Sequence, residues 1–253
     1  MKSSIAWLAR LSGIVLLLAL AQGLRADTVY NVVTQFSTAS NPNGVWSYLA
    51  NGTLYSSSEA FSDLVSGLPG WSTNGGVPND QFMAANNTAS PVTYGTVTLP
   101  AGDLTMDPES GSVAIDFTAP SAGTYAIAGN FLGIDSAEGT HPVEILDDGT
   151  VIWSGTISSD GQDDLFDLSE ALKAGDVISF YVGTGSAPNP NTACDAASTD
   201  LNYCDLGTGL DATVTLPSSS VPEPSTLPLL AAGLFGLILV SRRQRMFGRR
   251  TQA

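Results

Sequence analysis

VAIDFTAP, residues 113–120, is the stretch that decides the fold class. Val113, Ile115 and Phe117 alternate with small or polar residues, which is the period of a strand with one buried face. Pro120 closes the stretch because proline cannot donate to a strand ladder. Tyr125 and Ile127 then share one face of the following segment, so the sequence predicts two consecutive antiparallel strands.

The same pattern continues toward the end of the chain. Two apolar runs between residues 143 and 157 meet at Asp147-Asp148-Gly149-Thr150, and Asp-Gly supplies the positive φ that a tight hairpin turn requires. Further alternating runs cover residues 178–182 and 212–216, the first of them after a Gly175-Asp176 turn. We expect about eight to ten strands, and the predicted fold class is all-β, a two-sheet antiparallel β-sandwich.

The segment before Val92 is less regular. Ser56 and Glu59 have the spacing of a capping box, and Ala60, Phe61, Leu64 and Val65 follow at helical spacing. This pattern predicts one short helix that ends near Gly67. The glycine-rich stretch from there to Asn87 is expected to form a long surface loop.

The N-terminus has the three parts of a secretory signal peptide. Lys2 and Arg10 supply the charge, and Leu11–Ala21 supplies an apolar run that is too short for a membrane span of about 20 residues. Cleavage after Ala21 fits the small-x-small pattern of Ala19-Leu20-Ala21, and Ala26 precedes the acidic start of an expected first strand. We favour cleavage after Ala26. The predicted domains are a signal peptide over residues 1–26, an extracellular sandwich over 27–217 and a C-terminal tail over 218–253.

The C-terminal tail contains three ordered parts. Pro222, Glu223 and Pro224 precede an apolar helix over residues 227–240, and an Arg-rich end follows with Arg242, Arg243 and Arg245. At 1.5 Å per residue the apolar helix reaches roughly 21 Å, which is short for a hydrocarbon core about 30 Å thick. The arginines are expected to stop transfer and stay on the cytoplasmic side, leaving the Pro-Glu-Pro box at the outer face.

This ordered set resembles the PEP-CTERM exported proteins of Gram-negative bacteria. The resemblance implies passage through the secretion machinery, a transient stay in the inner membrane, recognition by an exosortase, and delivery to the cell surface or the extracellular matrix. An ordinary single-pass anchor is the alternative reading of the same residues.

The amino-acid composition limits the kinds of partner that the domain between the signal peptide and the C-terminal tail can bind. Residues 27–217 contain 23 acidic residues and one basic residue, Lys173. Nucleic acid is excluded as an expected partner because its phosphates are bound through Lys and Arg. Cys194 and Cys204 are predicted to form a disulfide in an oxidising compartment.

Four segments of the domain resemble, in order, bacterial jelly-roll domains of the carbohydrate-binding-module type. They are residues 41–48, 119–125, 148–150 and 174–178. The resemblance implies a jelly-roll sandwich that binds polysaccharide. Sugars stack on aromatic faces, and Trp46, Tyr48 and Trp71 are the predicted platforms because they lie among Asn, Gly and Ser in expected loops. Trp153 is expected in the core.

Calcium (Ca²⁺) is the one metal that the sequence favours. Asp160, Gln162, Asp163 and Asp164 bring three carboxylates and one amide into five residues, and calcium takes oxygen ligands in irregular geometry. The segment lacks the terminal glutamate of an EF-hand. A solvated turn is the alternative reading of these residues.

Catalysis is not expected. The chain has one histidine, His141, and neither a G-x-S-x-G elbow nor an H-E-x-x-H helix occurs. The sequence therefore predicts a non-catalytic cell-surface or matrix protein that binds polysaccharide. A calcium-bridged structural or adhesive protein is the alternative, and a glycoside-cleaving enzyme that uses two carboxylates is the third reading.

Overall fold

The computed structural model describes residues 26–61, 67–73, 81–94, 96–108, 111–136, 139–183 and 207–218, together with Gly233. The predicted signal peptide, the Cys194–Cys204 pair and the sorting tail lie outside these residues, apart from single positions. Among the residues that are described, no helix is long and apolar enough to cross a membrane. The strands belong to one compact unit, Thr28–Pro217.

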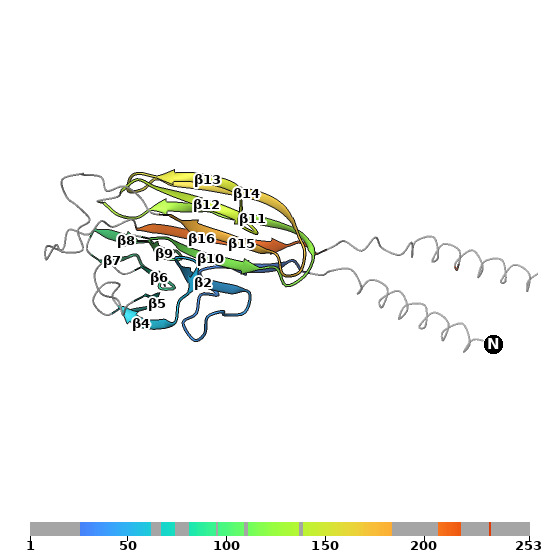
Figure 1. The fold of residues 1–253 in the computed structure, drawn as a ribbon, viewed down its shortest axis with the longest axis horizontal. Helices are drawn as coiled ribbons and strands as arrows, with labels where there is room; N and C mark the ends of the chain where they lie inside the picture. Colours follow the sequence, from blue (N-terminus) through green and yellow to red (C-terminus); the bar gives the residue numbers. More distant parts are fainter. Residues whose placement is uncertain are drawn as a thin grey trace, which may run out of the picture. The chain divides into compact units, whose positions relative to one another are not determined.

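Six strands form one sheet of the sandwich, in the order β13-β12-β15-β10-β2-β3 (Figure 1). Their bounds are β2 Trp46–Ala50, β3 Thr53–Leu54, β10 Val113–Thr118, β12 His141–Asp147, β13 Thr150–Ile157 and β15 Val177–Val182. The strands β12 and β13 are the hairpin predicted at Asp147–Thr150, and Asp148 has the expected positive φ of 46°. We call this layer the six-stranded sheet.

The second layer has the order β14-β11-β16-β9-β6-β5-β4, and β1 pairs with β16. Its strands are β1 Thr28–Asn31, β4 Ser57–Phe61, β5 Leu68–Ser72, β6 Phe82–Ala85, β9 Leu104–Asp107, β11 Gly123–Gly133, β14 Asp163–Leu172 and β16 Thr208–Leu216. We call this layer the eight-stranded sheet. Two short strands, β7 Val92–Tyr94 and β8 Val97–Leu99, form a separate hairpin.

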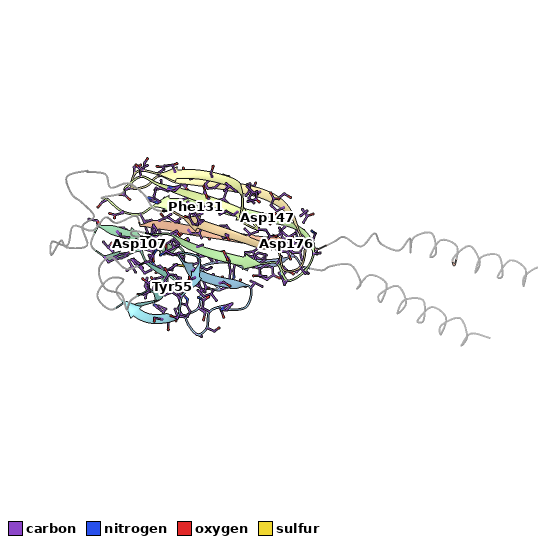
Figure 2. The ribbon with its side chains drawn as sticks, in the orientation of Figure 1. Tyr55, Asp107, Phe131, Asp147 and Asp176 are labelled. Atoms are coloured by element: carbon purple, nitrogen blue, oxygen red, sulfur yellow. The ribbon has the colours of Figure 1, made fainter. Side chains whose placement is uncertain are left out.

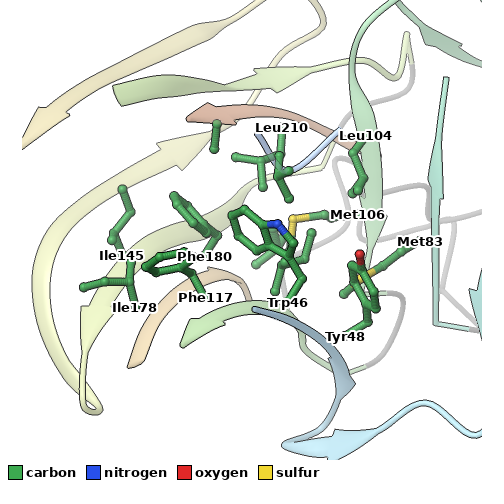
Figure 3. Packing of buried hydrophobic residues seen from close by; sticks show 14 of the residues in the cluster. Trp46, Tyr48, Met83, Leu104, Met106, Phe117, Ile145, Ile178, Phe180 and Leu210 are labelled. Carbon is green, nitrogen blue, oxygen red and sulfur yellow. The ribbon is translucent and has the colours of Figure 1, made fainter. Parts of the chain in front are cut away.

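The predicted all-β antiparallel sandwich is confirmed, because the strand pairs of both sheets are antiparallel. The predicted alternation of apolar and polar residues along the strands determines which side chains form the core. Ile115 and Phe117 from β10 are fully buried, as are Ile178 and Phe180 from β15, and side chains of the eight-stranded sheet such as Met106 meet them from the opposite layer (Figure 3). Burial of this apolar surface is the main stabilising term of the fold.

The structure corrects both predictions for the segment before Val92. Where the structure describes this segment the predicted helix is wrong, because residues 57–61 form β4, which pairs with β5 from Ser57↔Ser72 to Phe61↔Leu68. Residues 62–66 of the predicted helix lie outside the described residues. The predicted surface loop is wrong as well, because β5 and β6 lie within it and the side chains of Phe82 and Met83 are buried. Antiparallel pairing with the next strand, β5, which itself pairs with β6, overrode the helical spacing.

The hairpin of β7 and β8 covers part of the outer face of the eight-stranded sheet. The amide of Thr98 donates to the carbonyl of Ile134 at 2.8 Å, which joins β8 to the end of β11. Beneath the hairpin lies a second apolar cluster of Leu68, Phe82, Ala84, Val97, Leu99 and Ile134. The sandwich therefore carries a third, short layer at this end.

The two ends of the domain meet at one end of the sandwich. Thr28 and Leu216 are partners in the β1–β16 ladder, and the amide of Ser218 donates to the Asp27 carboxylate at 2.8 Å. The other end of β16 begins at Thr208, whose hydroxyl lies 2.6 Å from His141 Nε2 at the start of β12. At about 3.3 Å per residue these two ends are roughly 27 Å apart. In Figure 2, Asp147 and Asp176 mark one end, and Asp107, which follows the Thr208 partner Met106 in β9, marks the other.

Candidate functional site

The three predicted aromatic platforms do not lie in loops. Trp46 and Tyr48 belong to β2 and Trp71 belongs to β5, and their side chains are 1%, 0% and 4% exposed. Trp46 packs against Phe117 with ring centroids 5.3 Å apart, and Tyr48 stacks on Trp71 at 6.2 Å. A ring covered on both faces by protein cannot stack on a sugar, so we no longer assign these residues to a ligand.

Their polar atoms are used inside the fold. Trp46 Nε1 donates to Gln35 Oε1 at 2.9 Å, and Trp71 Nε1 donates to the carbonyl of Ser37 at 3.1 Å. Burial raises the pKa of Tyr48 to about 12. Residues 35–37 thus close one side of the core over these rings, and Figure 3 shows Trp46 and Tyr48 directed into it.

The predicted calcium segment covers the turn after β13, with Asp160 and Gln162, and the first two residues of β14, Asp163 and Asp164. Asp163 faces outward and accepts from Asn130 Nδ2 at 2.7 Å, whereas Asp164 accepts from Gln162 Nε2 at 3.1 Å. The two carboxylates point to opposite faces because they are consecutive in a strand. Within the described part of the chain, no three His, Cys, Asp or Glu side chains lie close enough together to hold a metal. Calcium binding stays a prediction.

His141 is a structural residue in this fold. Its side chain is 1% exposed, and burial lowers its pKa to about 4. Nε2 is hydrogen-bonded to Thr208 Oγ1 across the two sheets, and Nδ1 lies 3.3 Å from the carbonyl of Gly139. A general base must reach its substrate, and protein encloses this imidazole.

Tyr181 is the aromatic residue that the structure places on an open sheet face. Phe180 and Val182, its neighbours in β15, point into the core, so Tyr181 points outward and is half-buried. It lies opposite Ala114 in β10 and opposite Glu144 in β12. The pairing continues to both sides and makes a cross-strand row on the outer face of the six-stranded sheet, the Tyr181 row: Ser154, Glu144, Tyr181, Ala114 and Leu49.

Gly183 determines how the Tyr181 ring lies. A Cβ on Gly183 would lie 3.0 Å from Tyr181 Cε1, 3.4 Å from the Tyr181 hydroxyl oxygen and 2.9 Å from Pro142 Cγ. The ring therefore leans along β15 over the bare Cα of Gly183 and beside Pro142. The ring packs on this part of the sheet, and the Tyr181 side chain as a whole is half-buried.

Polar side chains lie on the same face of the sheet as this ring. Ser179 donates its hydroxyl to the Asp116 carboxylate on the next row of the same face, and burial raises the pKa of Asp116. Neither Glu144 nor the Tyr181 hydroxyl makes a side-chain hydrogen bond to another described residue. Carboxylate and hydroxyl groups beside an accessible ring are what a small polar ligand requires.

The outer face of the eight-stranded sheet carries acidic groups and, in the hairpin that covers part of it, the half-buried ring of Tyr94. Burial, with help from the nearby carboxylates of Asp211 and Asp163, raises the pKa of Asp103 to about 6. Asn31 Nδ2 donates to Asp211 at 3.3 Å on this face. The two faces differ, because the Tyr94 ring packs against Phe82 with ring centroids 6.1 Å apart, whereas Tyr181 packs against no other ring among the described residues.

Sequence reasoning missed the Tyr181 row, although one signal for it was present. The alternation that places Ile178, Phe180 and Val182 inward also places Tyr181 outward. The cross-strand partners Ala114 and Glu144 could not be found this way, because they are 67 and 37 positions away.

Comparison with known proteins identifies the C-terminal tail. Residues 220–244 match the family described as the PEP-CTERM protein-sorting motif. The motif indicates an exported protein that is processed and sorted to the cell surface, and it implies recognition by an exosortase. No curated protein matches the chain.

Solved structures similar to the chain include two carbohydrate-binding modules and an adhesin domain. A family 35 module from Clostridium thermocellum is 14% identical, with a TM-score of 0.27, over 53% of this chain and 83% of that one. The corresponding module of Paenibacillus barcinonensis is 12% identical, with a TM-score of 0.28, over 76% and 99%. The cleaved adhesin domain of Lys-gingipain from Porphyromonas gingivalis is 9% identical, with a TM-score of 0.32, over 77% and 100%.

Proposed function

We propose that this exported protein is a non-catalytic surface or matrix component that holds polysaccharide on the Tyr181 row. The observation that carries the proposal is the Tyr181 ring resting over Gly183 on an open sheet face. An accessible ring stacks on the apolar face of a sugar, and Glu144 and the Asp116–Ser179 pair supply partners for its hydroxyls.

The proposal also states that the protein binds polysaccharide without cleaving it. His141 is enclosed between the two sheets, and a binding role requires no base or nucleophile. Release of reducing sugar from a bound polymer, lost on replacement of Glu144 or Asp116, would contradict this part of the proposal.

Retention on insoluble polymers tests the binding role. The full chain, produced in an exporting host and purified, is sedimented with cellulose, chitin, chitosan, mannan and the host's own matrix polymer, with and without a calcium chelator. Tyr181→Ala should abolish retention, because it removes the stacking surface. Gly183→Ala should weaken retention, because its Cβ displaces the ring.

Leu165→Ala is the matched control, since Leu165 is an apolar side chain that is 72% exposed on the other sheet. Unchanged thermal unfolding of each variant shows that the fold is intact. Equal retention of Tyr181→Ala and the original chain would remove the Tyr181 row as the site. Failure of every polymer to retain the chain would remove polysaccharide binding itself, and loss of retention in chelator alone would support the calcium prediction.

A further inference from the structure

The groups around Tyr181 carry one sign of charge. Glu144 is directly opposite Tyr181 in β12, and Asp116 lies on the neighbouring row in β10, hydrogen-bonded to Ser179. The wider domain adds to this field, because Lys173 is the one basic residue against 23 acidic residues between positions 27 and 217. A ligand at this ring meets carboxylates and no cation among the described groups that face it.

This arrangement disfavours acidic sugars. A uronate or sulfate group on the Tyr181 ring would approach Glu144 without a positive partner, and like charges in close contact are repelled. Neutral sugars are accommodated through hydroxyl hydrogen bonds to the two carboxylates. A cationic sugar gains a further interaction, because an ammonium group makes charge-assisted hydrogen bonds to carboxylates and is attracted to the face of an aromatic ring.

We infer that the Tyr181 row selects a polysaccharide with free amino groups, a partly or fully deacetylated amino-sugar polymer. The inference rests on the proposed function and adds the class of ligand. The Tyr181 ring stacks on one sugar unit. Glu144 accepts from its ammonium group, and the Asp116–Ser179 pair lies within the same face for a neighbouring unit.

The experiment compares three soluble probes of equal length on the full chain. They are β-1,4-linked hexamers of glucosamine, of N-acetylglucosamine and of glucose, and their dissociation constants are measured by calorimetry. We expect the glucosamine hexamer to bind about tenfold more tightly than the N-acetylated one. High salt should remove most of this preference and leave the binding of neutral hexamers unchanged.

Two charge-matched variants separate recognition at the ring from attraction by the whole acidic domain. Glu144→Gln keeps the size of the side chain and removes its charge, so it should reduce the preference for glucosamine to about twofold or less. It should weaken the binding of the neutral hexamers much less, because the amide oxygen still accepts hydroxyl hydrogen bonds. Asp167→Asn removes the same charge from an exposed position on β14 of the other sheet, and should keep the full preference.

Different results would contradict the amino-sugar inference and the proposed function. Equal affinity for the three hexamers, or an equal loss of preference in both variants, would overturn the amino-sugar inference while leaving polysaccharide binding in place. Absence of binding to all three hexamers and to every insoluble polymer would instead overturn the proposed function.

Discussion

The charged form of the Asp103 side chain is disfavoured by its surroundings in the fold. It is partly buried beside Asp211 and Asp163, and its pKa is raised to about 6. The folded state therefore binds a proton more readily than the unfolded chain, so the charge of Asp103 destabilises the fold above pH 6 and this penalty disappears as the pH falls toward the ordinary value of 3.8.

Asp103→Asn should stabilise the protein at pH 8 by about 2 kcal/mol, a value reduced for partial exposure. The gain should shrink as the pH falls from about 6 to about 4. Urea unfolding of both proteins across this range measures it. A gain that stays constant with pH would show that the partly buried charge of Asp103 is not the cause.

His141 gives a pH dependence of opposite sign. Its pKa is about 4 in the fold, below the ordinary 6.5, so the unfolded chain binds the proton first as the pH falls. Stability attributable to the neutral imidazole is complete above pH 6.5 and is lost between 6.5 and about 4, by about 3 kcal/mol.

His141→Gln removes this titration while keeping a polar side chain near Thr208. The difference in unfolding free energy between the original chain and the variant should therefore decrease between pH 6.5 and 4. A difference that is the same at both values would place the imidazole in a solvated environment and contradict the buried Thr208 bond.

Single residues also show why the binding face could not be predicted fully. Trp46 lies among Asn, Gly and Ser in the sequence, as a loop aromatic would, and it is buried because β2 pairs with β10 and brings Trp46 opposite Phe117. Its burial depends on a partner 71 positions away. The outward direction of Tyr181 follows from local alternation alone, whereas the glycine beneath its ring is recognisable only in three dimensions.

At the scale of elements, Gly129 sets the distance between β11 and β16. A Cβ at this position would lie 2.0 Å from the carbonyl oxygen of Asp211 and 2.9 Å from Phe166 Cζ. The first atom belongs to the backbone and cannot rotate away, so the two strands must move apart to accept any side chain.

Gly129→Ala should therefore cost at least about 3 kcal/mol of unfolding free energy. Ala128→Ser, at the exposed neighbouring position of the same strand, should cost less than about 0.5 kcal/mol. Chemical denaturation of the pair measures the contrast. Similar stabilities for the two variants would show that β11 and β16 do not approach as closely as described.

The strands β10, β11, β12, β13, β15 and β16 were predictable because their two-residue period and their Asp-Gly and Gly-Asp turns are local signals. The strand β14 was not predicted, because its first residues, Asp163 and Asp164, were interpreted as a loop. β4 was not, because the spacing of Ala60, Phe61, Leu64 and Val65 fits a helix as an isolated segment. Its strand conformation comes from pairing with β5. The residue spacing predicts the conformation of an isolated segment, whereas in the fold this segment pairs with a neighbouring strand.

The carboxylates of the domain repel one another at neutral pH, because positions 27–217 contain 23 acidic residues and one basic residue. Raising NaCl from about 0.02 M to about 0.5 M shortens the Debye length from roughly 20 Å to roughly 4 Å. We expect this change to raise the unfolding free energy at pH 7 by on the order of 1 kcal/mol.

The same salt series at about pH 3, where most carboxylates are protonated, should show little of this gain. Thermal unfolding monitored by circular dichroism provides both measurements. A gain of the same size at the two pH values would assign it to general salt effects on apolar burial instead of charge repulsion.

The hydrogen bond between Ser218 and Asp27, next to the Thr28↔Leu216 pair, has a consequence for modularity. A chain that enters and leaves its domain at adjacent points can be placed inside a loop of another protein without separating that loop's ends. It can also be closed into a ring by a short peptide and reopened at an exposed turn such as Asp148-Gly149. At the point of insertion, the two ends of this sandwich are separated only by the distance between neighbouring strands of one sheet.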